Sequence, residues 1–238
     1  MPYTHLLYKN QVSINDHIKI VIPTVGDIIK DEDSYYSLVS CITAMPIDLI
    51  AQLDEVGIDF STINEYELFL MTFPGLAERD TSLLFGDLDL SKFKIAVNEQ
   101  NGNVILLDDE NDIKIDRAIH GYMADVLRKI HHLDKDRRKP ANKEAKDYMV
   151  QRAKEKAKRR RRKKPESQLE PLIVALVNTE QFKYDFDSVK NISIYQFNES
   201  LKQIVNKVEY DNRMYGVYTG TIDTKKLSQS DFNWLIHK

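Results

Sequence analysis

Residues 116–133, DRAIHGYMADVLRKIHHL, hold a clear helix signal. Their apolar residues recur every three or four positions, the spacing that places side chains on one face of a helix. Asp116 suits the N-cap position, because its carboxylate can accept from the free N–H groups of the first turn. The stretch predicts a half-buried helix from Asp116 to Leu133. Its apolar residues are Ile119, Met123, Val126, Leu127, Ile130 and Leu133.

The residues before this helix predict a β-hairpin region. Two apolar runs, residues 93–97 and 104–107, flank Asn101-Gly102, a pair that tolerates positive φ and favours a tight turn. Residues 112–115 predict a third strand. The acidic stretch 108–112 lacks the central Gly and the Glu at position twelve of a calcium-binding EF-hand loop, so we interpret it as a turn.

The first 75 residues predict a small sheet followed by short amphipathic helices. Residues 5–8 and 12–14 predict a hairpin, and residues 17–22 alternate with period two, as a half-buried strand does. The predicted helix starts are Thr24, Asp33-Ser34, Pro46, and a capping box formed by Thr62 and Glu65.

Charge is segregated along the chain. Residues 1–116 hold seven basic and 21 acidic residues, whereas residues 117–164 hold 19 basic and six acidic ones. Residues 165–238 are nearly neutral, and the whole chain has a net charge of −3. Such asymmetry concerns partners and solubility rather than fold.

The densest basic run lies at residues 152–164. It has good helix propensity but no apolar stripe, which predicts a solvated helix or mobile linker, and repulsion between like charges argues against a stable helix from Arg159 onward. We interpret the run as a linker or a dock for an acidic protein surface, either this chain's own first 116 residues or a second copy. Nucleic-acid contact is the alternative, without base stacking, because no aromatic residue lies inside the run. The binding candidates are Lys154, Lys156, Lys158, Arg159, Arg160, Arg161, Arg162, Lys163 and Lys164.

The end of the chain regains an apolar pattern. Residues 169–177 predict a compact helix, and Ser193 predicts the cap of a helix that runs through Val208. The tail that follows is rich in aromatic residues, so we expect it to be tied into a core or held by a neighbouring subunit. Its candidate interaction residues are Tyr215, Tyr218, Phe232 and Trp234.

No motif for catalysis, a cofactor or a metal is found. The phosphate loop, dinucleotide-binding, nucleophile-elbow and zinc-protease patterns are absent from the sequence. His120 and His131 are eleven residues apart, too far to bind one metal from a helix, and we interpret them as part of a polar helix face. Cys41, the single cysteine, lies in an apolar context and predicts a buried thiol. A chain with one cysteine, no apolar run long enough to cross a bilayer and no secretory signal fits the cytoplasm.

Several stretches resemble proteins from the structural modules of phages and prophages of Gram-positive bacteria. The resemblance rests on residues 35–40, 44–49 and 52–60 near the start, and on residues 195–200, 207–211, 214–223 and 233–235 near the end. It implies a role in virion structure or tail assembly, including a role like that of a tail-assembly chaperone. It carries over no functional residue.

Together these patterns predict a mainly helical α+β protein with an acidic mixed domain (1–133), a basic linker or solvated helix (134–166) and a C-terminal helical region (167–238). The predicted function is that of a non-enzymatic phage structural or tail-assembly protein, working in the host cytoplasm or incorporated in the virion. Its partners would be other phage structural proteins or copies of itself, with no membrane and no cofactor. The alternative is a nucleic-acid-binding packaging or regulatory protein that uses the basic run.

Overall fold

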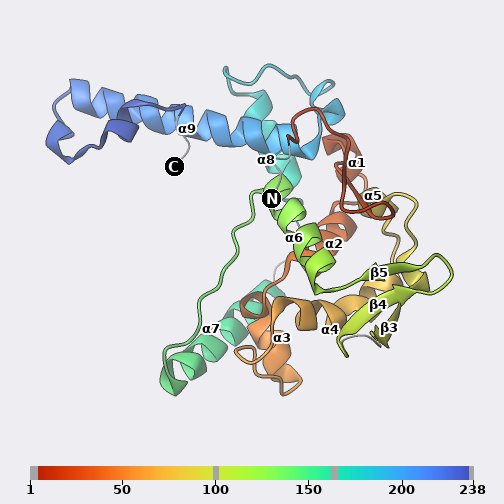
Figure 1. The fold of residues 1–238 in the computed structure, drawn as a ribbon. Coiled ribbons are helices and arrows are strands. Elements are labelled where there is room, and N and C mark those ends of the chain that lie inside the picture. The colour runs from red at the N-terminus through yellow and green to blue at the C-terminus, as the bar shows by residue number, and fades with distance from the viewer. Residues whose placement is uncertain (1–4, 99–101, 162–165, 236–238) are drawn as a thin grey trace.

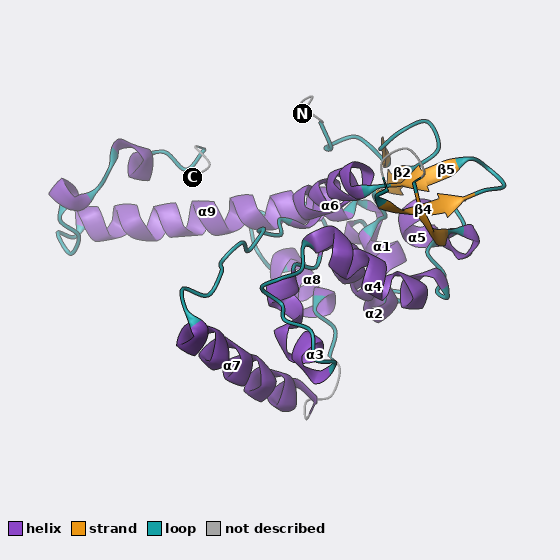
Figure 2. Ribbon diagram, turned by 60° about the horizontal axis from the view of Figure 1, so that its bottom comes forward, coloured by secondary structure: helices purple, strands orange, loops and turns teal. Residues whose placement is uncertain are grey.

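The computed structural model describes residues 5–98, 102–161 and 166–235. Most of the chain forms a body of helices with two small antiparallel sheets, and one long helix, α9 (Ile194–Tyr218), projects away from it (Figure 1). Figure 2 shows the strands of the three-stranded sheet on the opposite side of the body from the tip of α9. The predicted class, mainly helical α+β, is confirmed. The predicted division into three domains stays a prediction.

The first sheet pairs β1 (Gln11–Ser13) with β2 (Lys19–Val21) in antiparallel register, Val12 opposite Ile20. The predicted strand at residues 17–22 is therefore confirmed, but the predicted hairpin between residues 5–8 and residues 12–14 is wrong, because residues 11–13 pair with residues 19–21 instead. The tight connection is made instead by Asn15, whose side chain accepts from the N–H groups of His17 and Ile18 at 2.9 and 2.7 Å. Such an Asx turn reverses the chain after residue 14 rather than at residues 9–11.

Short helices follow, and their N-caps differ in detail from those predicted. Thr24 caps α1 as expected, whereas α2 is capped by Asp31. The capping box before α4 is formed by Asn64 and Glu67 rather than by Thr62 and Glu65, because Asn64 adopts the extended backbone that places its side-chain oxygen over the first turn. The elements are α1 (Val25–Ile28), α2 (Glu32–Thr43), the 3₁₀ helix η1 (Pro46–Leu49), α3 (Ile50–Glu55), α4 (Glu65–Ala77), α5 (Ser82–Phe85) and η2 (Leu90–Lys92).

The second sheet is an antiparallel meander of β3 (Lys94–Val97), β4 (Val104–Asp108) and β5 (Ile113–Ile115). The predicted hairpin and third strand are confirmed; Asn101 lies outside the described residues. Asp108 organises the acidic turn, because its carboxylate accepts from the backbone of Glu110 and Asn111. The Tyr66 hydroxyl of α4 donates to the carbonyl of Ile115 at 2.8 Å, which fixes the sheet against the helices.

Helix α6 (Arg117–His131) is capped by Asp116 as predicted and packs on α2, α4 and α9. Its apolar face is buried in the main hydrophobic core, which the segment after residue 166 also joins. Helices α7 (Lys143–Arg161) and α8 (Leu169–Val177) and the 3₁₀ helix η3 (Val189–Asn191) follow α6. The N-terminus of α8 is capped by Glu32 of α2, whose carboxylate accepts from the N–H groups of Gln168 and Leu169 at 2.7 and 2.9 Å.

The start of α9 is fixed to the N-terminal part of the chain. The N–H of Val25 donates to the carbonyl of Ile192, and the N–H of Ile194 donates to the carbonyl of Pro23, both at 2.9 Å. Gly26 permits this approach, because a Cβ there would lie 2.8 Å from the carbonyl oxygen of Lys190. Ser193 caps α9 as predicted, with Gln196 completing a capping box. The remaining elements are η4 (Thr224–Lys226) and η5 (Gln229–Phe232).

Candidate interaction surfaces

Helix α7 is docked on the body, so the mobile-linker form of the prediction is wrong for its described residues, whereas most of the run from Arg152 to Arg160 is exposed, as in a solvated helix. Met149, Val150 and Ala153 pack against a small apolar cluster built around Ile50 and Leu53 of α3. Figures 1 and 2 both show α7 lying alongside α3. Residues 149, 150 and 153 form a short apolar patch on one face of α7, within a stretch of sequence that is otherwise rich in charged residues.

Two ion pairs join α7 to acidic residues of the first half of the chain. Lys146 pairs with Asp59, and Lys154 pairs with Asp54 of α3. The hydrogen bond from Lys146, helped by those from Ser61, lowers the pKa of the Asp59 carboxyl to about 2. An acidic surface that the basic run can dock on is thus provided by this chain itself.

The opposite face of α7 points to solvent. Tyr148, Arg152, Lys156 and Arg159 recur at helical spacing on that face and are all exposed; we call them the outward row. The guanidinium carbon of Arg152 lies 5.7 Å from the centroid of the Tyr148 ring, which is 59% exposed. Tyr148 therefore adds an exposed aromatic ring one turn before the basic run, which itself contains no aromatic residue.

The nine predicted binding residues fall into three groups. Lys154 faces the body and is paired with Asp54. Helix α7 continues to Arg161, although repulsion between like charges was expected to end it at Arg159. These charges are exposed to water, which screens the repulsion between them. Lys156, Lys158, Arg159 and Arg160 are exposed. Arg162, Lys163 and Lys164 lie outside the described residues, as does the side chain of Arg161.

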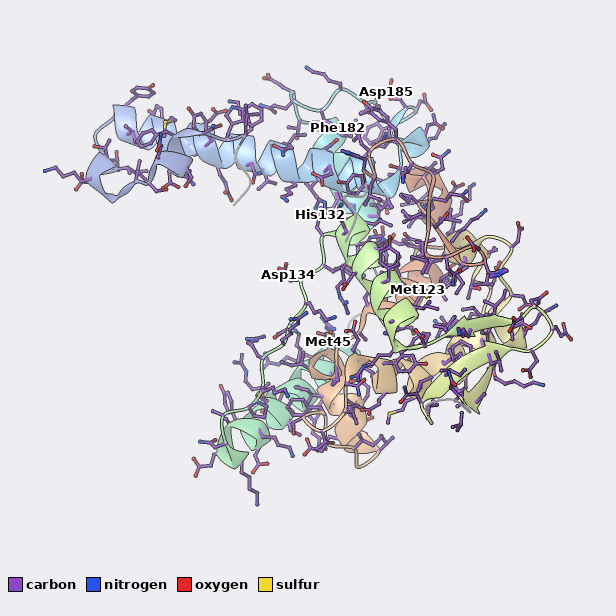
Figure 3. The ribbon with its side chains drawn as sticks, viewed as in Figure 1. Met45, Met123, His132, Asp134, Phe182 and Asp185 are labelled. Carbon is purple, nitrogen blue, oxygen red and sulfur yellow. The ribbon has the colours of Figure 1, made fainter. Side chains whose placement is uncertain are left out.

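An extended strap, residues 132–142, connects α6 to α7. Figure 3 shows it leaving α6 at His132, passing Asp134 and running toward α7. Lys135 of the strap binds Glu65 of α4 at 2.6 Å, beside Arg128 of α6, which also pairs with Glu65. Burial acts to raise the pKa of the Glu65 carboxyl, but the hydrogen bonds from Lys135 and Arg128 outweigh it and hold that pKa below its ordinary value.

The strap borders a cavity of about 480 Å³. Apolar side chains from η1 and from the loop before α4 line it, including Ile47, Phe60 and Ile63. Five lysine and arginine residues also line it. Lys135 pairs with Glu65 and Arg138 pairs with Asp136, whereas no ion pair joins Arg117, Arg137 or Lys139 to another described residue. The cavity is open, and its basic lining comes from the same positively charged part of the chain as α7.

The C-terminal tail folds back along α9. The ring of Trp234 lies 5.9 Å from the Lys207 ammonium, and Asp231 pairs with Arg213 at 3.4 Å. Ile222 lies against Gly216, where a Cβ would come within 2.7 Å of the isoleucine. The tail is thus held by its own helix, and its described residues do not join the main core as one of the two expectations had it.

The four predicted interaction aromatics are not gathered into one patch. Tyr215 and Tyr218 are on α9 and are 72% and 86% exposed. Phe232 is half exposed on the returning tail, and Trp234 is partly covered against α9. Only the two tyrosines extend outward from the helix itself.

The stripe of α9 that enters the core continues beyond it. Ile194 and Phe197 are fully buried, and Leu201 and Ile204 pack against the core. The same three- and four-residue spacing continues through Val208, Asp211, Tyr215 and Tyr218, with Val205 beside it. We call the exposed continuation, Val205, Val208, Asp211, Asn212, Tyr215 and Tyr218, the free face of α9.

The histidines of α6 are structural and correct the prediction of a polar helix face. His120 is buried, stacks on Phe69 with ring centroids 4.2 Å apart, and lies 3.1 Å from the carbonyl oxygen of Ile42. Burial lowers the pKa of His120 to about 4. His131 lies 2.9 Å from the hydroxyl of Tyr35, and burial lowers its pKa to about 4 as well.

Cys41 is half-buried rather than buried, and burial raises the pKa of its thiol. Within residues 5–98, 102–161 and 166–235, no three His, Cys, Asp or Glu side chains are grouped to hold a metal ion. In the same part of the chain, no helix combines the length and the apolar character needed to cross a bilayer.

Residues 160–237 match the family model of the YomV second domain. The family takes its name from a Bacillus prophage, and the match supports a phage origin for this chain. It covers less than half of the chain and says nothing of tail assembly. A search of curated proteins and a search of solved structures find no match.

The YomV-matched segment contains α8, α9 and the returning tail. Its first part contributes to the main core, whereas its second part carries the free face of α9. The free face was not predicted from the sequence, although its signal is present: apolar residues recur every three or four positions from Ile194 to Tyr218, with Asp211 as the one interruption. The pairing of Glu65 with Arg128 had no sequence signal, because the two residues are 63 positions apart.

Proposed function

We propose that this chain is a non-enzymatic phage structural or assembly protein that works through protein–protein contacts. The observation that carries the proposal is the free face of α9: a helix whose buried stripe continues into solvent, with Tyr215 and Tyr218 largely exposed. Exposed aromatic residues on a rigid element are typical of protein interfaces. The phage origin supported by the YomV match agrees with such a role.

The arrangement of α9 suits it for binding. Hydrogen bonds from Val25 and Ile194 fix its first turn, and the folded-back tail braces its distal half on the side of Lys207 and Arg213. The free face is therefore presented on a supported helix, so little conformational entropy is lost when a partner binds. A tail-assembly role, including a chaperone-like one, is the finer form of this proposal.

The experiment is an affinity purification from phage-producing cells of the tagged chain, with mass spectrometry of the co-purified proteins. We expect identified virion or assembly proteins with the wild-type chain and their loss with Val208→Glu. A matched control is Val174→Glu, which places the same charge on an exposed valine of α8. Retention of the same partners by Val208→Glu would overturn the assignment of the free face as the contact surface.

Nucleic-acid binding is a second candidate function, which the outward row of α7 favours. Three exposed cations and an exposed tyrosine ring lie along one helix face, so that phosphates and a base could be bound together. The docking of Lys146 and Lys154 on acidic residues removes those two cations from this role.

The test compares DNA binding by fluorescence anisotropy over a range of salt concentrations. Arg152→Gln with Arg159→Gln should weaken binding and reduce the salt slope by about two. Lys19→Gln with Lys114→Gln removes the same charge from exposed strand positions and should change neither. Equal behaviour of the two double variants, or no binding by the wild type at about 50 mM salt, would exclude the outward row as a nucleic-acid surface.

A further inference from the structure

We infer that the free face of α9 pairs with the same face of a second copy of this chain, with the two helices antiparallel. This inference rests on the proposed function and names the partner. The relevant residues lie in three positions of the helix: Val205 and Val208 nearer the body, Asp211 and Asn212 in the middle, and Tyr215 and Tyr218 toward the tip.

The order of these residues is self-complementary about a two-fold axis between Asp211 and Asn212. In an antiparallel pair, Val208 lies opposite Tyr215 of the second copy, and Val205 lies opposite Tyr218. Each small branched side chain is then matched with an aromatic ring, as a close-packed contact requires. A two-fold contact uses one surface on both copies, so each helix contributes both halves of the match.

Electrostatics favour a second copy over a strongly charged foreign partner. Asp211 is the one charged residue of the free face, and both of its carboxylate oxygens accept from Lys207, at 2.5 and 2.6 Å. The face therefore presents no unpaired charge that would select an acidic or a basic surface. The Asp211 side chains that meet near the axis each bring their own counter-ion, which reduces the repulsion between them.

The shape of the molecule leaves room for this contact. The free face spans residues 205–218, which is about 20 Å of helix at 1.5 Å per residue. Figure 1 shows this part of α9 projecting beyond the body, with the returning tail along it. The tail contacts Lys207, Arg213 and Gly216, whereas Val208 and Tyr215 stay exposed. The antiparallel pair places the two bodies at opposite ends of the paired arms.

The contact is short, so we expect a weak and reversible dimer. A stable interface usually buries at least about 1,200 Å² in total, and two segments of this length reach only the lower end of that range. We expect a Kd on the order of a micromolar. Sedimentation velocity of the full chain at concentrations of tens of micromolar should therefore show dimers. Val208→Glu should raise the Kd at least about tenfold, whereas Val174→Glu should leave it unchanged.

Cross-linking tests the antiparallel arrangement directly. Because Cys41 is the single cysteine, a Cys41→Ser background allows one new cysteine per chain. We expect a short bismaleimide to link Val208→Cys chains to Tyr215→Cys chains in a mixture and to link neither variant efficiently to itself. Val174→Cys, mixed with either one, is the control for random collision.

The experiments distinguish a failure of the self-association inference from a failure of the proposed function. Linkage of Val208→Cys to itself would indicate a parallel pair and overturn the antiparallel arrangement. A wild-type chain that stays monomeric to about 100 µM would overturn self-association. If Val208→Glu then still loses its phage partner in affinity purification, the proposed function stands and the free face binds a foreign protein. If dimers form but no phage protein co-purifies, self-association stands and the proposed function fails.

Discussion

Arg128 of α6 donates to the carboxylate of Glu65 of α4 where only 6% of the arginine side chain and 14% of the glutamate side chain are exposed. The same guanidinium donates to the carbonyl of Thr43 at the end of α2, at 2.6 Å, and to Asp125 at 3.2 Å. One buried side chain thus joins α2, α4 and α6. Figure 3 labels Met45, whose sulfur lies 3.7 Å from this group.

Replacing Arg128 with Met should lower the free energy of unfolding by about 3 kcal/mol, because the largely buried Glu65 carboxylate is left with Lys135 alone. Urea unfolding followed by circular dichroism measures this loss. Adding Glu65→Gln removes the stranded charge and should recover part of it. A single variant as stable as the wild type would show that the pair contributes nothing.

The docking of α7 should depend on its short apolar patch more than on its ion pairs. Val150→Asp places a charged group against the apolar Ile50 and Leu53 and should release α7 from α3, whereas exposed ion pairs each contribute only about 0–1 kcal/mol. Limited trypsin digestion should then cleave within residues 143–161 while the body stays folded. Gln151→Asp, on an exposed position beside it, should leave the digestion pattern unchanged, and faster cleavage in both variants would contradict the role of the patch.

The free energy of unfolding should decrease as the pH is lowered from 6.5 to about 4, because of His120. Its pKa is about 4 in the folded protein and about 6.5 when unfolded, so over this range the unfolded chain binds the proton first. The stability is fully present above pH 6.5 and is lost as the pH falls, by up to about 3 kcal/mol. Urea unfolding at pH 7 and pH 5 measures the loss, which His120→Phe should reduce. An unchanged pH dependence in that variant would assign the effect to other groups.

The returning tail should be displaced by a side chain at Gly216. In Gly216→Val the new Cβ would come within 2.7 Å of Ile222, so the tail must move away from α9. Trp234 is the single tryptophan, and its emission should shift to longer wavelength as it leaves Lys207 and enters water. Gly75→Val, where a Cβ meets nothing within 4 Å, is the control. An unshifted spectrum would mean that Ile222 does not hold the tail.

Local patterns determined most of the secondary structure. Helix α6, its Asp116 cap, the meander and the capped start of α9 follow from spacing and turn chemistry within a few residues, which is why they were predictable. Errors arose where neighbouring residues competed for one role. Asn64 rather than Thr62 caps α4, and Asn15 rather than residues 9–11 turns the first hairpin.

The sequence by itself determined the charge segregation, the mainly helical class and the apolar spacing that runs the length of α9. Tertiary structure alone decided which of these features are still available to a partner. Met149 and Val150 dock on α3, so one face of α7 is covered and the opposite face is free. Along α9 the core ends at Ile204, so the stripe is covered up to that residue and exposed beyond it. The physical reason is that burial and ion pairing depend on residues distant in sequence, whose positions no local pattern contains.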